Sequence, residues 1–467
     1  MDEQPLSARD FGAAFKGFLE QAVTDGPEDD PPFVVRIREH LGAEPSALSV
    51  VSQEFEYTDH ANVQIALDAL LNADGGTPEI LGFASPAAGY MPVTLASLLA
   101  PRGGGLMAGP SVALGPVQYV DVDLGPGGTL TCLQSGLVLA RRESGPLVVL
   151  VATGAEYGPR AGKVAVEALA PAREDAERFL ADLRGEIRRR NVFRGRVISL
   201  EGRQFGPPKV RFHELPGIER DRIVLPDGVL ERVERHTVGF SRHAERLRAA
   251  GRHLRRGLLF HGPPGTGKTL TAMYVVACMP ERTTLLLTGP ALGLVEQSVK
   301  IARMLEPSLV VLEDVDLVAE ERTEQSTGTN AVLFELLNQM DGLADDADVI
   351  FLLTTNRPDL LEPALASRPG RIDQAIEIAL PDAACRRRLL ELYAQGLTLD
   401  ADLDRLVERT QGASGAFIRE LLRKAALFAA DESEELVVRD QQLDEALHDL
   451  VVEGGKLTES LLGGPSA

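Results

Sequence analysis

Eight consecutive residues, Gly262 to Thr269, have the composition and spacing of a phosphate-binding loop. They read Gly-Pro-Pro-Gly-Thr-Gly-Lys-Thr, between a strand-like run, 257–260, and a helix-like segment, which is the context that the pattern G-x-x-x-x-G-K-[ST] requires. Glycines let the backbone wrap around phosphates, and free N–H groups at a helix N-terminus stabilise their charge. We expect Lys268 to reach the β- and γ-phosphates and Thr269 to bind Mg²⁺.

A second candidate is an apolar run that ends in acids, Leu309 to Asp316. Phosphoryl transfer needs a carboxylate near the magnesium ion and a group that orients or deprotonates water, usually at the end of a neighbouring strand. Glu313 and Asp314 can supply these two groups. The alternative interpretation is a surface hairpin whose acids are simply solvated.

The pattern after Arg255 predicts a parallel α/β sheet that would position both motifs. Short apolar runs alternate with helical segments, as in folds built from strand–helix–strand units. The candidate strands are 257–260, 283–287, 309–312, 349–353 and 375–380. After Pro381 the pattern is wholly helical, which predicts a small helical domain. Its candidate helices are 383–393, 403–409, 416–430 and 442–452.

The chain up to about Asn191 predicts an α+β module rich in strands. Its candidate strands are 119–124, 129–133 and 147–152, and its candidate helices are 8–22 and the amphipathic 172–190. The uncharged stretch 80–101 is long enough to span a bilayer, but two glycines and two prolines interrupt it between Gly82 and Pro92. These breakers favour strands and turns of a soluble domain.

Composition excludes several classes of protein. A formal net charge of −21 and a pI near 4.9 argue against a nucleic-acid binder or a binder of anionic membranes, because the summed field repels phosphate. Cys132, Cys278 and Cys385 are scattered and lack CxxC spacing, so neither a disulfide framework nor a zinc site is predicted. The first ten residues have no apolar run of the kind found in signal peptides. We expect a cytoplasmic protein.

From about Val210 to Val452 the sequence resembles the AAA family of AAA+ ATPases. Residues 337–342, Leu-Asn-Gln-Met-Asp-Gly, resemble the family's inter-subunit signalling helix and turn. Residues 354–373, from Thr-Thr-Asn-Arg-Pro-Asp to Arg-Pro-Gly-Arg-Ile-Asp, resemble its second region of homology. Residues 412–416 resemble the start of the lid helix that packs against the nucleotide. No such resemblance extends to the N-terminal module.

The resemblance implies a fold and a division into domains. The fold is an AAA+ P-loop domain of the α/β class, with a parallel five-stranded sheet and a small helical lid, preceded by the α+β module. The implied parts are a client- or adaptor-binding module 1–191, a large ATPase domain 192–381, a lid 382–453 and a flexible tail 454–467. The implied activity is ATP hydrolysis, with ATP and Mg²⁺ as cofactors.

The resemblance also assigns roles to single residues. Asn356 is the polar sensor that holds the attacking water or the γ-phosphate, and Arg368 and Arg371 are arginine fingers that act on the neighbouring subunit's ATP. Fingers that act in trans require a ring, for which we expect a hexamer. The expected metal ligands are Thr269 and Glu313. The expected nucleotide-binding residues are Gly262, Pro263, Pro264, Gly265, Thr266, Gly267, Lys268, Thr269, Leu270, Gly415 and Ala416.

Two features depart from the family pattern. The acidic strand usually ends Asp-Glu, but here it ends Glu313-Asp314, as in relatives of the mitochondrial translocase of the Rieske iron–sulfur protein. We therefore expect Glu313 beside magnesium and Asp314 as the base, with the reversed assignment as the alternative. The second departure is Gly289 to Val295, which lacks the aromatic residue that grips substrate in the pore of unfolding members.

The function expected from these residues is ATP-driven remodelling or translocation of a macromolecular client, most simply a protein, by a ring-shaped ATPase. A scaffold or switch that binds ATP with negligible turnover is the alternative, favoured by the reversed acids and the missing pore aromatic. A membrane-tethered protease subunit is disfavoured because the sequence contains no HExxH. The steady-state rate of ATP hydrolysis separates the first two hypotheses.

Overall fold

The computed structural model of the 467-residue chain divides into two compact units. They are Met1–Val192 with Arg203–Lys209, and Phe193–Gly202 with Val210–Ala467, and each is described by itself. The structure describes residues 11–17, 30–72, 77–84, 93–99, 112–154, 162–202, 208–316, 331–342, 344, 346–359, 372–432 and 435–453. Arg368, Arg371 and the predicted tail 454–467 lie outside the described residues. Of the predicted helix 8–22, residues 11–17 are described, and they are helical.

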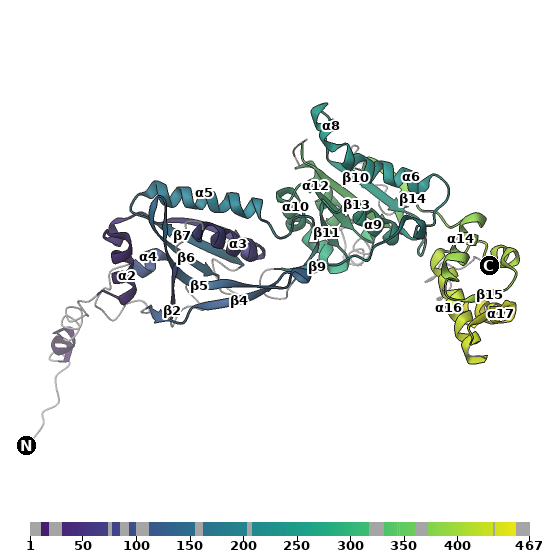
Figure 1. Cartoon of the computed structure of the whole chain (residues 1–467), viewed down its shortest axis with the longest axis horizontal. Helices are drawn as coiled ribbons and strands as arrows, with labels where there is room; N and C mark the ends of the chain where they lie inside the picture. Colours follow the sequence, from purple (N-terminus) through teal and green to yellow (C-terminus); the bar gives the residue numbers. More distant parts are fainter. Residues whose placement is uncertain are drawn as a thin grey trace, which may run out of the picture. The chain divides into compact units, whose positions relative to one another are not determined.

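The N-terminal unit is built on an antiparallel sheet (Figure 1). Its strands follow the order β1-β7-β6-β5-β2-β3, and β4 pairs with β5 as well. The strands are β1 Val51–Glu56, β2 Glu79–Ala84, β3 Ala113–Gly115, β4 Gln118–Asp123, β5 Thr129–Arg142, β6 Gly145–Thr153 and β7 Lys163–Leu169. In the order just given, β1 has a neighbour on one side only.

Helices cover both faces of this sheet. Along β6, Val149 and Val151 belong to the core formed with α3 and α5, whereas Val148 and Leu150 belong to the core formed with α2 and α4. This alternation follows from the two-residue period of a strand. The helices are α2 Pro32–Leu41, α3 His60–Leu71, α4 Leu95–Leu99 and α5 Arg173–Arg189. The unit is thus the α+β module that the sequence predicts.

The second unit contains a seven-stranded sheet in the order β14-β10-β13-β12-β11-β8-β9. The five predicted parallel strands are contiguous in this order, from β14 at one edge of the sheet to β11. The strands are β8 Val197–Glu201, β9 Lys209–His213, β10 Arg256–His261, β11 Thr283–Leu287, β12 Ser308–Leu312, β13 Val349–Thr355 and β14 Gln374–Glu377. β8 pairs parallel with β11. β8 and β9 extend the expected five-stranded sheet to seven strands. They were not predicted because residues that differ in exposure are mixed along them, so neither is a continuous apolar run.

Helices of this unit alternate with its strands along the chain, beginning after β9. They are α6 Val229–Glu234, the π-helix η5 Arg235–Gly239, α7 Phe240–Arg242, α8 Ala244–Ala249, α9 Lys268–Ala277, α10 Val295–Met304 and α12 Ala331–Asp341. No helix in the described part of the chain is both long and apolar enough to cross a membrane. In the uncharged stretch 80–101, the described residues form most of β2 and all of α4.

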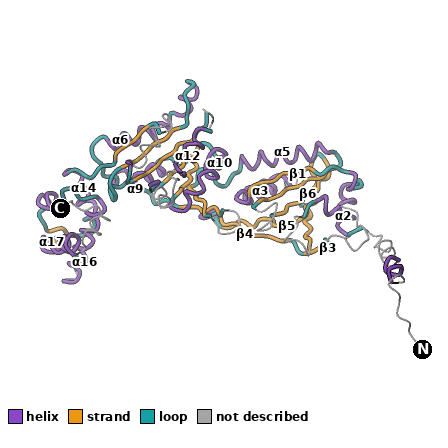
Figure 2. Tube along the Cα trace, turned by 180° about the vertical axis from the view of Figure 1, so that it is seen from behind, coloured by secondary structure: helices purple, strands orange, loops and turns teal. Residues whose placement is uncertain are grey.

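The lid closes the second unit with helices that bury one core (Figure 2). They are α14 Ala383–Tyr393, α15 Leu403–Arg409, α16 Gly415–Glu432, α17 Asp440–His448 and the π-helix η7 Asp449–Glu453. The expectation of a wholly helical lid is wrong in one respect. Two three-residue strands, β15 Thr398–Asp400 and β16 Val437–Arg439, pair in parallel, and strands this short give no periodic signal.

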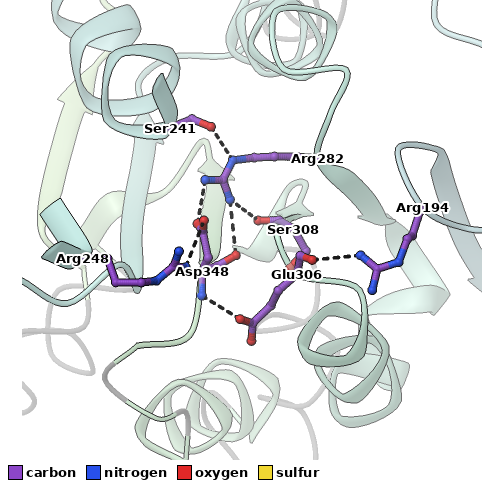
Figure 3. A network of polar contacts seen from close by, with 7 residues as sticks. All are labelled: Arg194, Ser241, Arg248, Arg282, Glu306, Ser308 and Asp348. Carbon is purple, nitrogen blue, oxygen red and sulfur yellow. Dashed lines mark hydrogen bonds and ion pairs between the residues drawn. The ribbon is translucent and has the colours of Figure 1, made fainter. Parts of the chain in front are cut away.

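A buried ion pair joins the starts of three central strands (Figure 3). Arg282 directly precedes β11, and its side chain is 2% exposed. It donates to Asp348 Oδ1 at 2.6 Å and to the carbonyl of Ser308, the first residue of β12, at 3.1 Å. Asp348 directly precedes β13, and its side chain is 8% exposed. The pair therefore links the N-terminal ends of these strands, and the phosphate-binding loop lies at the opposite, C-terminal end of the parallel strands.

Four further residues complete this network. Ser241 accepts a hydrogen bond from Arg282 Nε at 2.7 Å. Glu306 accepts one from the Asp348 N–H at 3.0 Å. At the rim, Arg248 lies 3.8 Å from Asp348 Oδ2, and Arg194 donates to the Glu306 carbonyl at 3.1 Å. Every hydrogen bond in this network joins segments that are distant in sequence, so the network is a tertiary rather than a local feature.

Candidate nucleotide site

The phosphate-binding loop connects the end of β10 to the start of α9. Lys268 opens α9 and is 6% exposed. Its Nζ donates to the carbonyls of Gly262 at 2.9 Å and Pro263 at 2.7 Å. Burial lowers the pKa of Lys268, while the charges of Asp314 and Asp316 raise it. The loop therefore holds an amine beside two carboxylates, at the N-terminus of a helix where anions are stabilised.

Two glycines are required by the close approach of other segments. Gly262 has φ 147°, and a Cβ there would lie 2.2 Å from the Ile378 carbonyl oxygen. Gly265 has φ 74°, and a Cβ there would lie 2.7 Å from Ser414 Oγ in the lid. Both conformations also disfavour any residue with a side chain. The loop is thus enclosed between the end of β14 and the start of α16.

The two acids after β12 have different surroundings. Glu313 Oε1 is buried and has no hydrogen-bond partner among the described residues. Burial and the charge of Asp314 raise the pKa of Glu313, and a hydrogen bond with the Thr269 side chain lowers it. A buried carboxylate oxygen without a donor, beside a threonine hydroxyl, fits a hard divalent cation such as Mg²⁺. This pair is the expected set of metal ligands.

Asp314 has a left-handed backbone, with φ 49°. Aspartate adopts this conformation more readily than most residues. The Asp314 N–H donates to Thr354 Oγ1 at 3.0 Å, and Asn356 Nδ2 lies 3.4 Å from Asp314 Oδ1. Burial raises the pKa of Asp314, as does the charge of Asp316, whereas Lys268 lowers it. The predicted base and the predicted sensor are therefore in contact.

Asp316 is a functional candidate to which the sequence pattern assigned no role. It is 5% exposed, and its Oδ1 accepts hydrogen bonds from Thr355 Oγ1 at 2.8 Å and from the Asn356 N–H at 3.1 Å. It thereby ties the end of β13 to the acidic segment after β12. The sequence shows that Asp316 belongs to the run that ends in acids. Its contacts with Thr355 and Asn356, however, depend on the pairing of β12 with β13.

Lys268, Asp314 and Asn356 line one cavity of about 1110 Å³. The lid contributes directly, because the Ala416 N–H donates to the Gly265 carbonyl at 3.1 Å. The predicted site residues that line the cavity are Pro264, Gly265, Thr266, Gly267, Lys268, Thr269, Leu270, Asp314, Asn356, Gly415 and Ala416. Gly262, Pro263 and Glu313 are not part of this lining. The carbonyls of Gly262 and Pro263 accept hydrogen bonds from Lys268, and Glu313 is hydrogen-bonded to the Thr269 side chain.

Other parts of the cavity wall were not anticipated. Leu215, Ile218 and Ile223 supply apolar surface from the segment before α6, and Arg419 lines the cavity from the lid helix α16. No motif marks these positions in the sequence. In the described residues, no group of three or more His, Cys, Asp or Glu side chains could hold a metal ion.

A parallel sheet with a phosphate-binding loop after β10, a polar residue after the adjacent strand β13, two acids after β12 on the far side of β13 and a helical lid defines a P-loop ATPase of the AAA+ type. Residues 258–380 match the model of the ATPase family associated with various cellular activities (AAA), and residues 400–445 match the AAA+ lid domain. The two matches identify these residues as an AAA ATPase domain with its lid. The activity of this domain is ATP hydrolysis, and its cofactors are ATP and Mg²⁺.

Curated relatives match the same half of the chain. The chain is 35% identical over 283 residues to ATP-dependent zinc metalloprotease FtsH 4 of Sphaerobacter thermophilus, covering 56% of this chain and 42% of the relative. It is 32% identical over 257 residues to FtsH of Mesoplasma florum, covering 52% and 38%. It is 36% identical over 229 residues to FtsH of Rhodococcus erythropolis, covering 46% of this chain and 26% of the relative. The chain thus spans less than half the length of these relatives.

Proposed function

We propose that this chain assembles into a homo-oligomeric ring, most simply a hexamer, and uses ATP hydrolysis to remodel or translocate a protein client. The observation that supports turnover is the contact between Asp314 and Asn356 inside a cavity that also holds Lys268. A base, a sensor and a phosphate-binding cation are the groups that ATP hydrolysis requires. The relatives are named ATP-dependent metalloproteases, which favours a protein as the client.

The proposal gives each part of the chain a role. The module 1–191 selects the client or an adaptor, the ATPase domain 192–381 hydrolyses ATP, and the lid 382–453 closes over the nucleotide. Lys268 binds the β- and γ-phosphates, Thr269 and Glu313 hold Mg²⁺, and Asp314 and Asn356 act on water. The setting is the cytoplasm, without nucleic acid or membrane as a partner.

Arg368 and Arg371 supply the link between subunits in this proposal. A guanidinium offered to the neighbouring ATP stabilises developing phosphate charge and is worth roughly 10³ to 10⁵ in rate. A variant that lacks both arginines should therefore bind ATP normally and hydrolyse it poorly. Mixing it with Lys268→Ala subunits should restore turnover, because some interfaces then pair an intact pocket with intact fingers.

Fluorescence transfer between labelled chains must first establish that the subunits exchange. Each variant is expected to be inactive alone, so recovered turnover requires a site shared between subunits. No recovery despite proven exchange would contradict the ring. The second candidate, an ATP-dependent scaffold or switch, is favoured by the reversed order of Glu313 and Asp314. It predicts unmodified protein that binds ATP but has negligible steady-state turnover.

A further inference from the structure

Strand β1 of the N-terminal unit presents backbone hydrogen-bonding groups at the edge of the sheet. Its pairing with β7 continues one residue further, where the Tyr57 N–H donates to the Gly162 carbonyl at 2.8 Å. In an antiparallel ladder, residue pairs that exchange hydrogen bonds alternate with pairs that do not. Because Tyr57 bonds toward β7, the residues of β1 with odd numbers do so as well.

A second bond agrees with this alternation. Lys163 lies opposite Glu56, and its carbonyl accepts from the Gly154 N–H at 2.9 Å, on the β6 side of β7. The pair Glu56 and Lys163 is therefore of the kind that exchanges no backbone bonds. It follows that Ser52, Glu54 and Glu56 direct their N–H and C=O groups away from β7, toward the side of β1 on which no described strand pairs.

A groove of about 560 Å³ runs between this edge and helix α5. Three residues of β1 line it, Val51, Ser52 and Gln53. The lining residues of α5 are Glu174, Glu177, Arg178, Leu180, Ala181 and Arg184. Val51 packs against the core under α5, and Leu180 is part of that core. The groove therefore combines apolar contact at Val51, Leu180 and Ala181 with charged side chains of α5 and with the backbone hydrogen-bonding groups of β1. Backbone hydrogen bonds together with side-chain contacts are the combination that binds an added strand.

A backbone carbonyl at this edge of the sheet already accepts a hydrogen bond, from the side chain of Gln53. Gln53 Nε2 donates to the Glu54 carbonyl at 3.3 Å, and Arg184 donates to Gln53 Oε1 at 2.8 Å. A side-chain amide thus bonds a carbonyl that the ladder with β7 leaves unused. The backbone N–H of an extended segment would make the same bond with better geometry and would continue along the edge.

The charges of β1 select the occupant. Ser52, Glu54 and Glu56 are exposed and share the face of the strand that points away from α5. Glu56 already forms an ion pair with Lys163, its direct partner on β7. Opposite charges at facing positions stabilise a strand pair and like charges destabilise it. A segment added on the open side would therefore carry lysine or arginine on this face and small apolar residues toward the groove.

We propose that the edge of β1 binds an extended, basic segment of the client polypeptide, which adds to the sheet as a strand alongside α5. The proposal deepens the role of the N-terminal module and rests on the proposed function, in which that module selects a protein client. The net charge of −21 favours the approach of a basic segment from a distance.

Binding of short peptides to the full chain tests the proposal by fluorescence anisotropy. The main probe is a labelled nonapeptide that alternates lysine and valine, and the comparison probe alternates glutamate and valine. Two further lysine–valine probes carry backbone N-methyl groups, one at every lysine and the other at every valine. The main probe should bind at least tenfold more tightly than the glutamate probe, as charge complementarity requires.

The methylated probes distinguish strand addition from attraction between charges. Directly opposed residues share a face, so an antiparallel strand bonds β1 through its lysine N–H groups, and a parallel strand bonds through its valine N–H groups. One methylated probe should therefore lose binding and the other should keep it. Equal binding of both methylated probes and the main probe would overturn the proposal, and so would no binding of the main probe.

Substitutions on β1 provide the matched test on the protein. Ser52→Pro removes one N–H that faces the open edge and should weaken binding about fivefold, whereas Ser52→Ala keeps the N–H and should bind normally. If Ser52→Pro fails to fold, Glu54→Lys with Glu56→Lys replaces it and should invert the preference between the two probes. An unchanged preference would overturn the proposal.

ATP hydrolysis measured on the same samples separates this proposal from the proposed function. Protein that turns over ATP but binds no probe contradicts strand addition alone. Protein that binds the probes as expected but has negligible turnover contradicts the proposed remodelling activity and leaves the binding site in place.

Discussion

Replacing Arg282 by methionine tests whether the ion pair at the start of the strands stabilises the ATPase unit. The side chains of Arg282 and Asp348 are 2% and 8% exposed, so the variant leaves a carboxylate buried without its partner. Breaking a buried pair from one side typically costs about 3–5 kcal/mol. Arg248 lies 3.8 Å from the same carboxylate and is half exposed, so it offsets part of the loss. We expect a loss of about 3 kcal/mol.

The double variant Arg282→Met with Asp348→Leu makes the test specific. It removes both charges, and replacing a buried pair by apolar residues is often close to neutral. The carbonyls of Ser308 and Asp348 still lose their donor, which costs about 1–3 kcal/mol. The double variant should therefore be more stable than the single one. The matched control is Arg248→Met, an exposed arginine whose loss should cost under about 1 kcal/mol.

Unfolding in urea followed by circular dichroism gives these free energies, since the chain contains no tryptophan. The transition of the ATPase unit is the one that ATP with Mg²⁺ shifts to higher urea. A double variant that is less stable than Arg282→Met would refute the reasoning, because the cost would then come from lost packing and not from an unpaired charge.

Two further predictions concern the nucleotide site. Lys268→Ala should abolish ATP binding in a fluorescent-nucleotide titration, because the loop loses the amine that contacts the β- and γ-phosphates, and undiminished affinity would contradict the site. Asp314→Asn should still bind ATP but hydrolyse it about 10² times more slowly, the usual scale for losing a positioned base. If Glu313→Gln is instead the variant that traps ATP, while Asp314→Asn loses magnesium, the two roles are reversed.

Local patterns predicted much of the fold of the second unit. The bounds of β11 Thr283–Leu287 and of α14 and α15 agree with the periodicity of the sequence, because each buries a continuous or regularly spaced apolar set. β8 and β9 were not predicted because they precede Arg255, where the alternation of apolar runs and helical segments begins. Their half-exposed residues give no distinct signal.

The nucleotide site divides in the same way. The phosphate-binding loop and the two acids are contiguous motifs and were predicted from spacing alone. The contacts of Asp316 with Thr355 and Asn356 join segments about 40 residues apart, so they depend on the register of neighbouring strands. The left-handed backbone of Asp314 and the edge groups of β1 likewise follow from tertiary pairing, which no local pattern encodes.

The contact between Gly265 and the lid has a consequence for how the cavity changes volume. The loop accepts a hydrogen bond from Ala416 and has no room for a side chain beneath Ser414. Any rotation of the lid away from the sheet must therefore break a bond to the phosphate-binding loop itself. Lid position and loop geometry are therefore coupled through a direct contact between Gly265 and Ala416.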